Sequence, residues 1–148
     1  MADTMKMNDD VTVGGQPTEQ EITSLATKGF KSVVNLRTAG EKEQPISPDD
    51  EAAMVKAAGM QYLHLPVSLK GMSEDLVDSF RAEFAKLPRP VFAHCAAGKR
   101  AGAMVMMDMA VEQGMTGDET LSKATEMGFD CDVPELEQFV KQYVDSHQ

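Results

Sequence analysis

The sequence predicts an α/β fold, with a central, mainly parallel sheet of four to five strands and helices on both of its faces. Three observations support this prediction. Short apolar segments alternate with longer segments of helical period, which is typical of parallel strands joined by right-handed crossovers. Capping residues precede the helical segments, and glycines follow several of them. The 148 residues are enough for one three-layer core and too few for two independent cores.

The elements follow in order from these signals. Branched and apolar residues predict strands at Val11–Val13, Lys31–Arg37, Gln61–Val67 and Val91–His94. Helices are expected after caps at Thr18, Ser47, Ser73 and Asp132, and at 103–111 and 118–127. The first helix has the strongest signal, because Thr18 and Glu21 form a capping box. Gly114 and Gly117 are expected to break the chain between helices.

The N-terminal residues and the overall charge limit the class of protein. Residues 1–10 are polar apart from their methionines, so we expect a flexible N-terminal arm before a single domain over residues 11–148. A net charge of −10 argues against nucleic acid and anionic membrane as partners, and requires a local positive site for any anionic substrate. No apolar run approaches the length of about 18 residues that spans a membrane, and residues 1–10 lack the core of a signal peptide. A cytoplasmic protein is therefore expected, with its oligomeric state left open.

The segment from Val91 to Gly102 carries the predicted chemistry. A buried strand runs into small residues and then into an apolar helix, so unpartnered amides at the helix start favour an anion. These amides and Arg100 would stabilise a thiolate at Cys95. The residues expected to bind the anion are Ala96, Ala97, Gly98, Lys99 and Arg100. The two cysteines, Cys95 and Cys131, are far apart and form no CxxC, so we expect no metal, no disulfide framework and no cofactor.

The order His94-Cys95, Gly98 and Arg100 resembles the signature of the cysteine-dependent protein tyrosine and dual-specificity phosphatases. That signature has five residues between cysteine and arginine, whereas this chain has four. The sequence is most similar to small bacterial phosphatase-like proteins with a Cys-X4-Arg loop. Their opening is similar to residues 14–18 and 32–37, with a glutamate shortly after and Leu-Pro-Val at 65–67. The resemblance, over about residues 11–128, implies a dual-specificity-phosphatase-like fold.

The resemblance also implies an activity and a role for several residues. It implies metal-independent hydrolysis of a phosphorylated protein or small phosphomonoester, with phosphotyrosine or another aryl phosphate favoured. Cys95 would be the nucleophile, and Arg100 would bind the phosphoryl oxygens. His94 is interpreted as structural in preference to a general base, and Glu41 as a residue that holds Arg100 in place. Asp75 is the candidate general acid, although it also suits the first turn of a helix as a stabilising charge.

Two other functions remain open from the sequence. A four-residue loop with a central glycine is also similar to rhodanese loops, in which the cysteine would carry a persulfide. Ala101 replaces the serine or threonine that usually follows the arginine, and the loop at 67–72 contains no carboxylate. These two departures also suit a non-catalytic phosphate-binding module.

Overall fold

The computed structural model describes residues 4–38, 40–41, 44–68, 71–96, 98–127 and 134–147. The chain divides into two compact units, residues 1–101 and residues 102–148. The first unit contains the whole β-sheet and the residues of the candidate site. The expectation of one domain over residues 11–148 stays a prediction.

The first unit is built on a five-stranded sheet in the order β1-β2-β5-β3-β4. Its strands are β1 (Thr4–Lys6), β2 (Val11–Gly14), β3 (Ser32–Asn35), β4 (Gln61–His64) and β5 (Val91–His94). Neighbours among β2, β5, β3 and β4 pair in parallel, and β1 alone pairs antiparallel, with β2. The predicted fold class, a mainly parallel sheet flanked by helices, is confirmed. β3 and β4 are shorter than the segments expected from their branched residues.

The described part of the N-terminal segment contains an edge strand, and the expectation that residues 1–10 form a flexible arm stays a prediction. Thr4–Lys6 forms the edge strand β1, and the chain then turns into β2. The Asn8 side chain accepts a hydrogen bond from Asp10 N at 2.8 Å, and Met7 N donates to Val11 O at 2.8 Å. Met7 is also buried. An Asx-type turn and one apolar anchor therefore order this short polar segment.

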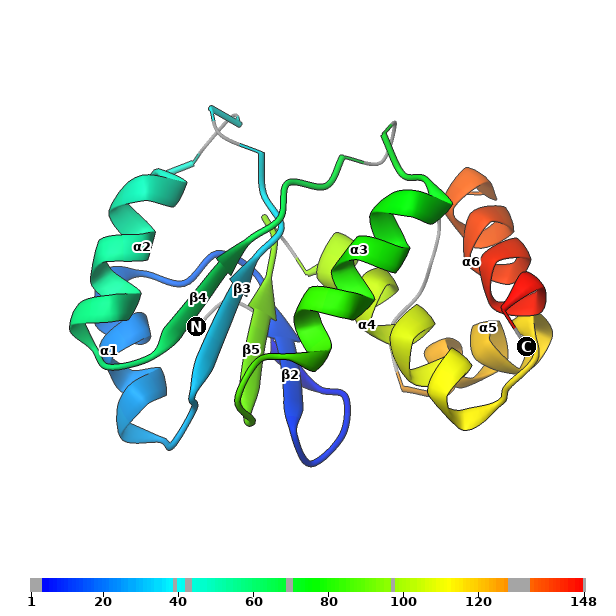
Figure 1. The fold of residues 1–148 in the computed structure, drawn as a ribbon, viewed down its shortest axis with the longest axis horizontal. Helices are drawn as coiled ribbons and strands as arrows, with labels where there is room; N and C mark the ends of the chain where they lie inside the picture. The colour runs from blue at the N-terminus through cyan, green and yellow to red at the C-terminus, as the bar shows by residue number, and fades with distance from the viewer. Residues whose placement is uncertain are drawn as a thin grey trace. The chain divides into compact units, whose positions relative to one another are not determined.

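Helices cover both faces of the sheet within the first unit. α1 (Glu19–Thr27) and α2 (Pro48–Ala57) lie on one face, and α3 (Glu74–Ala85) lies on the other (Figure 1). The caps expected at Thr18, Ser47 and Ser73 are all present, with the full capping box at Thr18. The core between the sheet, α1 and α2 consists of Ile22, Leu25, Val33, Val55, Met60 and Phe92. Each such buried side chain stabilises the fold by about 1.5–3 kcal/mol.

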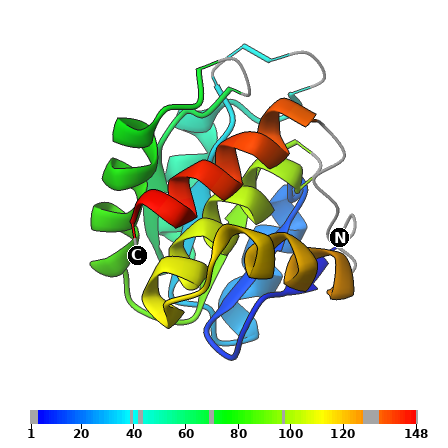
Figure 2. The ribbon, with the colours of Figure 1, turned by 90° about the vertical axis from the view of Figure 1, so that its right-hand side faces the viewer.

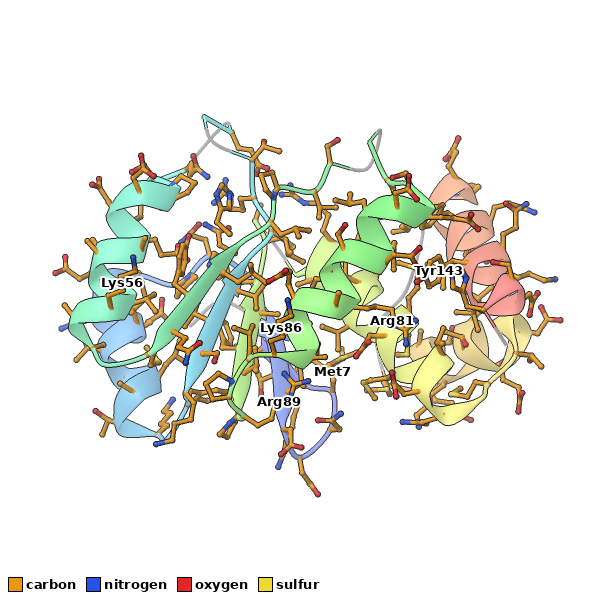
Figure 3. All side chains as sticks on the ribbon, viewed as in Figure 1. Met7, Lys56, Arg81, Lys86, Arg89 and Tyr143 are labelled. Atoms are coloured by element: carbon orange, nitrogen blue, oxygen red, sulfur yellow. The ribbon has the colours of Figure 1, made fainter. Side chains whose placement is uncertain are left out.

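α3 carries a stacked aromatic pair and an arginine that closes its C-terminal end. Phe80 and Phe84 are both buried, with ring centroids 4.9 Å apart. The Arg89 guanidinium lies 4.3 Å from the centroid of the Phe84 ring and donates to Phe84 O at 3.0 Å (Figure 3). Arg89 therefore makes a cation–π contact and also binds a carbonyl at the end of α3. Together these contacts fix the turn that leads into β5.

Strand register brings polar side chains together at the carboxyl edge of the sheet. Asn35, the last residue of β3, lies opposite His94 of β5 and His64 of β4. Gly14, at the end of β2, lies opposite His94 on its other side. The loops that follow these strands therefore begin next to one another, which is where α/β sheets bind their ligands.

The second unit contains helices only, among its described residues. α4 (Lys99–Gln113) starts at the end of the first unit and begins four residues before the expected 103–111 segment. α5 (Gly117–Glu126) and α6 (Pro134–Ser146) lie side by side (Figure 2). The ring of Tyr143 in α6, which is labelled in Figure 3, stacks on His147 just after the helix, with centroids 3.9 Å apart. The expected cap at Asp132 and the second cysteine, Cys131, lie outside the described residues.

Gly117 does not break the chain as expected. It is the first residue of α5, after a capping box between Thr116 and Glu119. Gly117 N donates to Asp145 Oδ1 at 2.7 Å, and a Cβ at this position would lie 2.6 Å from Lys141 Cγ. The glycine is thus explained by the close approach of α6. None of the described helices in either unit has the length and apolarity that crossing a membrane requires.

Candidate active site

The loop after β5 places Cys95 against backbone amides. Cys95 is 1% exposed, and its own amide donates to Gly14 O at 3.3 Å. Its Sγ accepts hydrogen bonds from Gly98 N at 3.1 Å and from Ala101 N at 3.5 Å. Because these two donors lie at the start of α4, the helix dipole acts in the same direction. Both effects favour an anion in this loop.

The loop is held in shape by glycine and by the segment after β2. Gly98 has φ +98°, a left-handed conformation that side-chain-bearing residues rarely adopt. Gln16 N donates to Ala96 O at 3.2 Å, so the segment from Gly14 to Gln16 lies along the loop. This backing keeps the loop amides pointing toward the sulfur.

Arg100 in the first turn of α4 is held from one side by Glu41. Its NH1 and NH2 groups donate to Glu41 Oε2 at 2.6 Å and Oε1 at 2.9 Å, and NH1 also donates to Val67 O at 2.9 Å. The contact expected between Glu41 and Arg100 is therefore present. The Arg100 guanidinium holds the pKa of the Glu41 carboxyl far below its ordinary value of 4.5. Glu41 therefore stays ionised through the acid range.

The same guanidinium has a second edge that can face an anion. Among the described residues, Glu41 and Val67 use three of the five N–H groups that an arginine carries, and the other two, on Nε and NH2, share one edge of the planar group. The pKa of Arg100 is raised, first by Glu41 and then, against the effect of burial, by the charge of Cys95. Arg100 therefore interacts with both Glu41 and Cys95.

Arg37 supports Glu41 from the other side. It is 2% exposed, and its Nε donates to Glu41 Oε1 at 3.0 Å while NH1 donates to Gln16 Oε1 at 3.1 Å. Its backbone is fixed as well, because Arg37 N donates to Asn35 Oδ1 at 2.9 Å and His64 Nε2 donates to Arg37 O at 2.6 Å. Glu41 thus lies between two arginines and is locked in orientation.

His94 is engaged by a buried carboxylate on α2. Its Nε2 lies 2.6 Å from Glu51 Oε2, and both side chains are fully buried. Glu51 Oε1 accepts from Gln16 Nε2 at 2.8 Å. Burial and the Glu51 charge together raise the pKa of Tyr62, whose OH accepts from Asn35 Nδ2 at 3.0 Å. These contacts support a structural role for His94, which stays a prediction.

The structure brings some predicted site residues together and leaves others apart. Cys95, Gly98, Arg100 and Glu41 form one cluster, and Lys99 is half-buried beside them in the first turn of α4. Ala96 is exposed and uses its carbonyl, as described above, while Ala97 lies outside the described residues. Asp75 is exposed in the first turn of α3, and no hydrogen bond or ion pair links it to a described residue of the loop.

Sequence reasoning missed Gln16 and Glu51. The signal for Glu51 was its spacing, because it precedes the buried Val55 by one helical turn while Asp49 and Asp50 in the same acidic run are exposed. Gln16 lies in the opening at 14–18 that carries the resemblance, but its role was not predicted because its partners lie 21 and 35 residues away.

No group of three or more histidine, cysteine, aspartate or glutamate side chains within the described ranges is arranged to hold a metal ion. The polar groups of the site are instead paired as carboxylate with guanidinium or with imidazole. This arrangement suits a ligand that brings its own negative charge.

Residues 3–115 match the family described as the phosphatase-like domain of beta-lactamase hydrolase-like proteins. The chain belongs to this family. The beta-lactamase hydrolase-like protein of Agrobacterium fabrum is 32% identical over 126 residues, which is 85% of this chain. That of Xylella fastidiosa is 29% identical over 124 residues, or 84% of this chain. The match covers only 29% of the length of each relative.

Solved structures show the same fold for this phosphatase-like domain. A DUF442 protein from Shewanella putrefaciens gives a TM-score of 0.81 at 22% identity, with 99% of this chain and 93% of that chain covered. TpbA from P. aeruginosa, in complex with phosphotyrosine, gives a TM-score of 0.74 at 22% identity, with coverage of 96% and 85%. The resemblance to cysteine-dependent tyrosine phosphatases is thereby confirmed at the level of the fold.

Proposed function

We propose that the chain is a cysteine-dependent phosphatase that hydrolyses phosphomonoesters, with aryl phosphates such as phosphotyrosine preferred. One observation carries the proposal: Cys95 Sγ accepts two amide hydrogen bonds close to Arg100, which Glu41 holds by its outer edge. A nucleophilic sulfur beside an arginine with two donors on one edge is the arrangement that phosphoryl transfer requires. Membership of a phosphatase-like family supports this proposal.

The reaction would proceed in two displacements at phosphorus. The Cys95 thiolate attacks in line, an S–P bond forms, and the ester P–O bond breaks with its electron pair on the leaving oxygen. Arg100 and the loop amides bind the equatorial oxygens. Water then attacks the phosphocysteine, which releases inorganic phosphate and returns the thiolate.

The preference for aryl phosphates rests on the carboxylate that the described part of the site contains. This is Glu41, which contacts Arg100 and is bound to Arg37 as well. Its low pKa excludes it as a proton donor. A phenolate leaves without full protonation, whereas an alkoxide does not. The phosphotyrosine complex of the structurally similar TpbA supports the same substrate class.

The test is hydrolysis of p-nitrophenyl phosphate in the presence of EDTA. We expect turnover, inhibition by vanadate, and loss of turnover in Cys95→Ser. Trapping of ³²P on the wild-type protein, and its absence from the variant, would identify the phosphocysteine. Turnover that survives in Cys95→Ser would contradict the proposal.

A rhodanese-like sulfurtransferase is the second candidate, and Ala101 is the observation that favours it. Ala101 is fully buried and has no hydroxyl to assist departure of the Cys95 sulfur from phosphorus. A persulfide on Cys95 needs no such assistance, because cyanide attacks the outer sulfur directly. Cleavage of thiosulfate with cyanide, and a gain of one sulfur in the mass of the protein, would favour this candidate. Neither activity, with tungstate still raising the Tm, would indicate a binding module.

A further inference from the structure

A continuous path of hydrogen bonds connects the residue before Cys95 to the arginine that ends its loop. The path runs through five links, each between 2.6 and 3.1 Å. Its members, in order, are His94, Glu51, Gln16, Arg37, Glu41 and Arg100. The two ends flank the nucleophile, so the path closes a ring around the catalytic loop.

Burial shows that this path is built into the fold. Glu51 and His94 are fully buried and Arg37 is 2% exposed. A buried carboxylate costs several kcal/mol unless it is paired and hydrogen-bonded. Among the described residues, Glu51 meets that condition through His94, Gln16 and the neighbouring Tyr62. None of the contacts recorded for Glu51 involves the sulfur or the loop amides, so its effect on chemistry must be indirect.

Gln16 connects Glu51 to Arg37 and holds the Arg37 side chain in its orientation. Its Nε2 donates to Glu51 and its Oε1 accepts from Arg37, so the amide is held in one of its two possible orientations. A carboxylate at this position could not donate to Glu51, and an apolar side chain could contact neither partner. Arg37 in turn fixes Glu41 Oε1, the same oxygen that receives Arg100 NH2.

We propose that Glu51 and Gln16 are positioning residues for Arg100, acting through Arg37 and Glu41 to hold the guanidinium edge that binds the substrate anion. The inference rests on the proposed function only for the identity of that anion. Helix α2 would thus take part in the site through Glu51, the member of the path that lies on this helix.

The experiment compares Gln16→Met, Glu51→Gln and the double variant with wild type. Asp50→Asn is the matched control, because it removes a charge from the same turn of α2 at an exposed position. The first measurement is the NMR spectrum of the Arg100 guanidinium in the ligand-free protein, assigned with Arg100→Lys. Slow rotation, seen as separate Nη signals, reports that Glu41 holds the group. The second is the Kd for tungstate, a tetrahedral dianion, by calorimetry.

We expect the separate signals to be lost in both single variants, and tungstate affinity to fall by about 3- to 30-fold, the usual range for network residues without ligand contact. The double variant should be no weaker than the worse single variant, because both substitutions interrupt one path. kcat/KM for p-nitrophenyl phosphate should fall with the tungstate affinity, and Asp50→Asn should match wild type in every measurement.

A folded Gln16→Met variant with wild-type Arg100 signals and wild-type tungstate affinity would overturn the inference. Gln16 is only half-buried, so this variant decides the matter even if Glu51→Gln fails to fold. The spectrum and the binding assay need no turnover. A wild-type protein without phosphatase activity but with the expected Arg100 signals would therefore contradict the proposed function and leave the positioning role intact.

Discussion

The two sides of the Cys95 loop differ in how much structure supports them. On the side of Arg100, carboxylates, an amide and two arginines are joined by hydrogen bonds, and two of these side chains, Arg37 and Glu51, are buried. On the side of α3, the candidate proton donor Asp75 is exposed in a first helical turn. Among the described residues, the Arg100 side is therefore the better connected of the two, which agrees with the proposal that the site binds an anion. Phosphotyrosine-like substrates fit that balance.

The largest effect should come from the anion-binding side. Arg100→Lys keeps one charge but loses the planar edge with two donors, so we expect kcat/KM for p-nitrophenyl phosphate to fall by about 10²–10³-fold. Arg89→Lys is the control, because Arg89 lies over Phe84 before β5 and none of its contacts with described residues is with the site. A fall of less than threefold in Arg100→Lys would mean that the guanidinium does not bind the substrate.

Removal of the carboxylate between the arginines should affect both stability and binding. Glu41→Gln leaves Arg37 and Arg100 without their shared anion, so we expect the free energy of unfolding at pH 7 to fall by about 1–3 kcal/mol. Tungstate affinity should fall as well. Urea unfolding and calorimetry measure the two effects. An unchanged stability would show that the two arginines do not depend on Glu41.

The difference in free energy of unfolding between wild type and Glu41→Gln should shrink as the pH falls. The folded-state pKa of Glu41 is depressed, so its stabilising contribution is fully present above its ordinary value of 4.5 and is lost as the pH falls through the folded value. Wild type and Glu41→Gln should therefore differ most above pH 5 and converge in stronger acid. Urea midpoints from pH 7 down to pH 3 test this, and a gap that widens in acid would contradict it.

The proton-donor side should respond weakly. A working general acid contributes about 10²–10⁴-fold, whereas we expect Asp75→Asn to change kcat for aryl phosphates by less than about threefold, because an exposed surface charge has little effect. The rate should instead depend steeply on the leaving group, which a series of substituted phenyl phosphates and β-glycerophosphate would measure. A selective loss of alkyl phosphate hydrolysis in Asp75→Asn would identify Asp75 as the acid.

Local signals predicted the elements well. Thr18 and Glu21 sit in one turn and form the capping box that the sequence indicates, and Val91–His94 is a strand with the expected bounds. β1 was missed because its three residues carry no apolar alternation and are ordered by pairing with β2. β3 ends at Asn35, earlier than its branched residues suggest, because ladder pairing rather than propensity sets strand length.

The site was predictable only where a motif spans it. Cys95, Gly98 and Arg100 are close in sequence, so their spacing indicated an anion-binding loop. Glu41 lies 59 residues from Arg100, and the resemblance alone indicated that contact. Glu51 reaches His94 across 43 residues, and its spacing from Val55 indicates the buried face of α2 but not the histidine that it contacts. Long-range partners of this kind become visible only in the folded chain.

The second step of the reaction should respond to a change at residue 101. Ala101 is fully buried and its amide lies 3.5 Å from Cys95 Sγ, so a hydroxyl added at this position would lie close to the sulfur as it leaves phosphorus. If breakdown of the phosphocysteine limits turnover, Ala101→Ser should raise kcat for p-nitrophenyl phosphate by about two- to tenfold, since one hydrogen bond contributes about 0.5–1.5 kcal/mol. The burst of p-nitrophenolate before the steady state should shrink in the same variant, as stopped-flow absorbance would show. A burst of unchanged amplitude with unchanged kcat would mean that the first displacement is limiting, and the weakness of the site would then lie wholly on its proton-donor side.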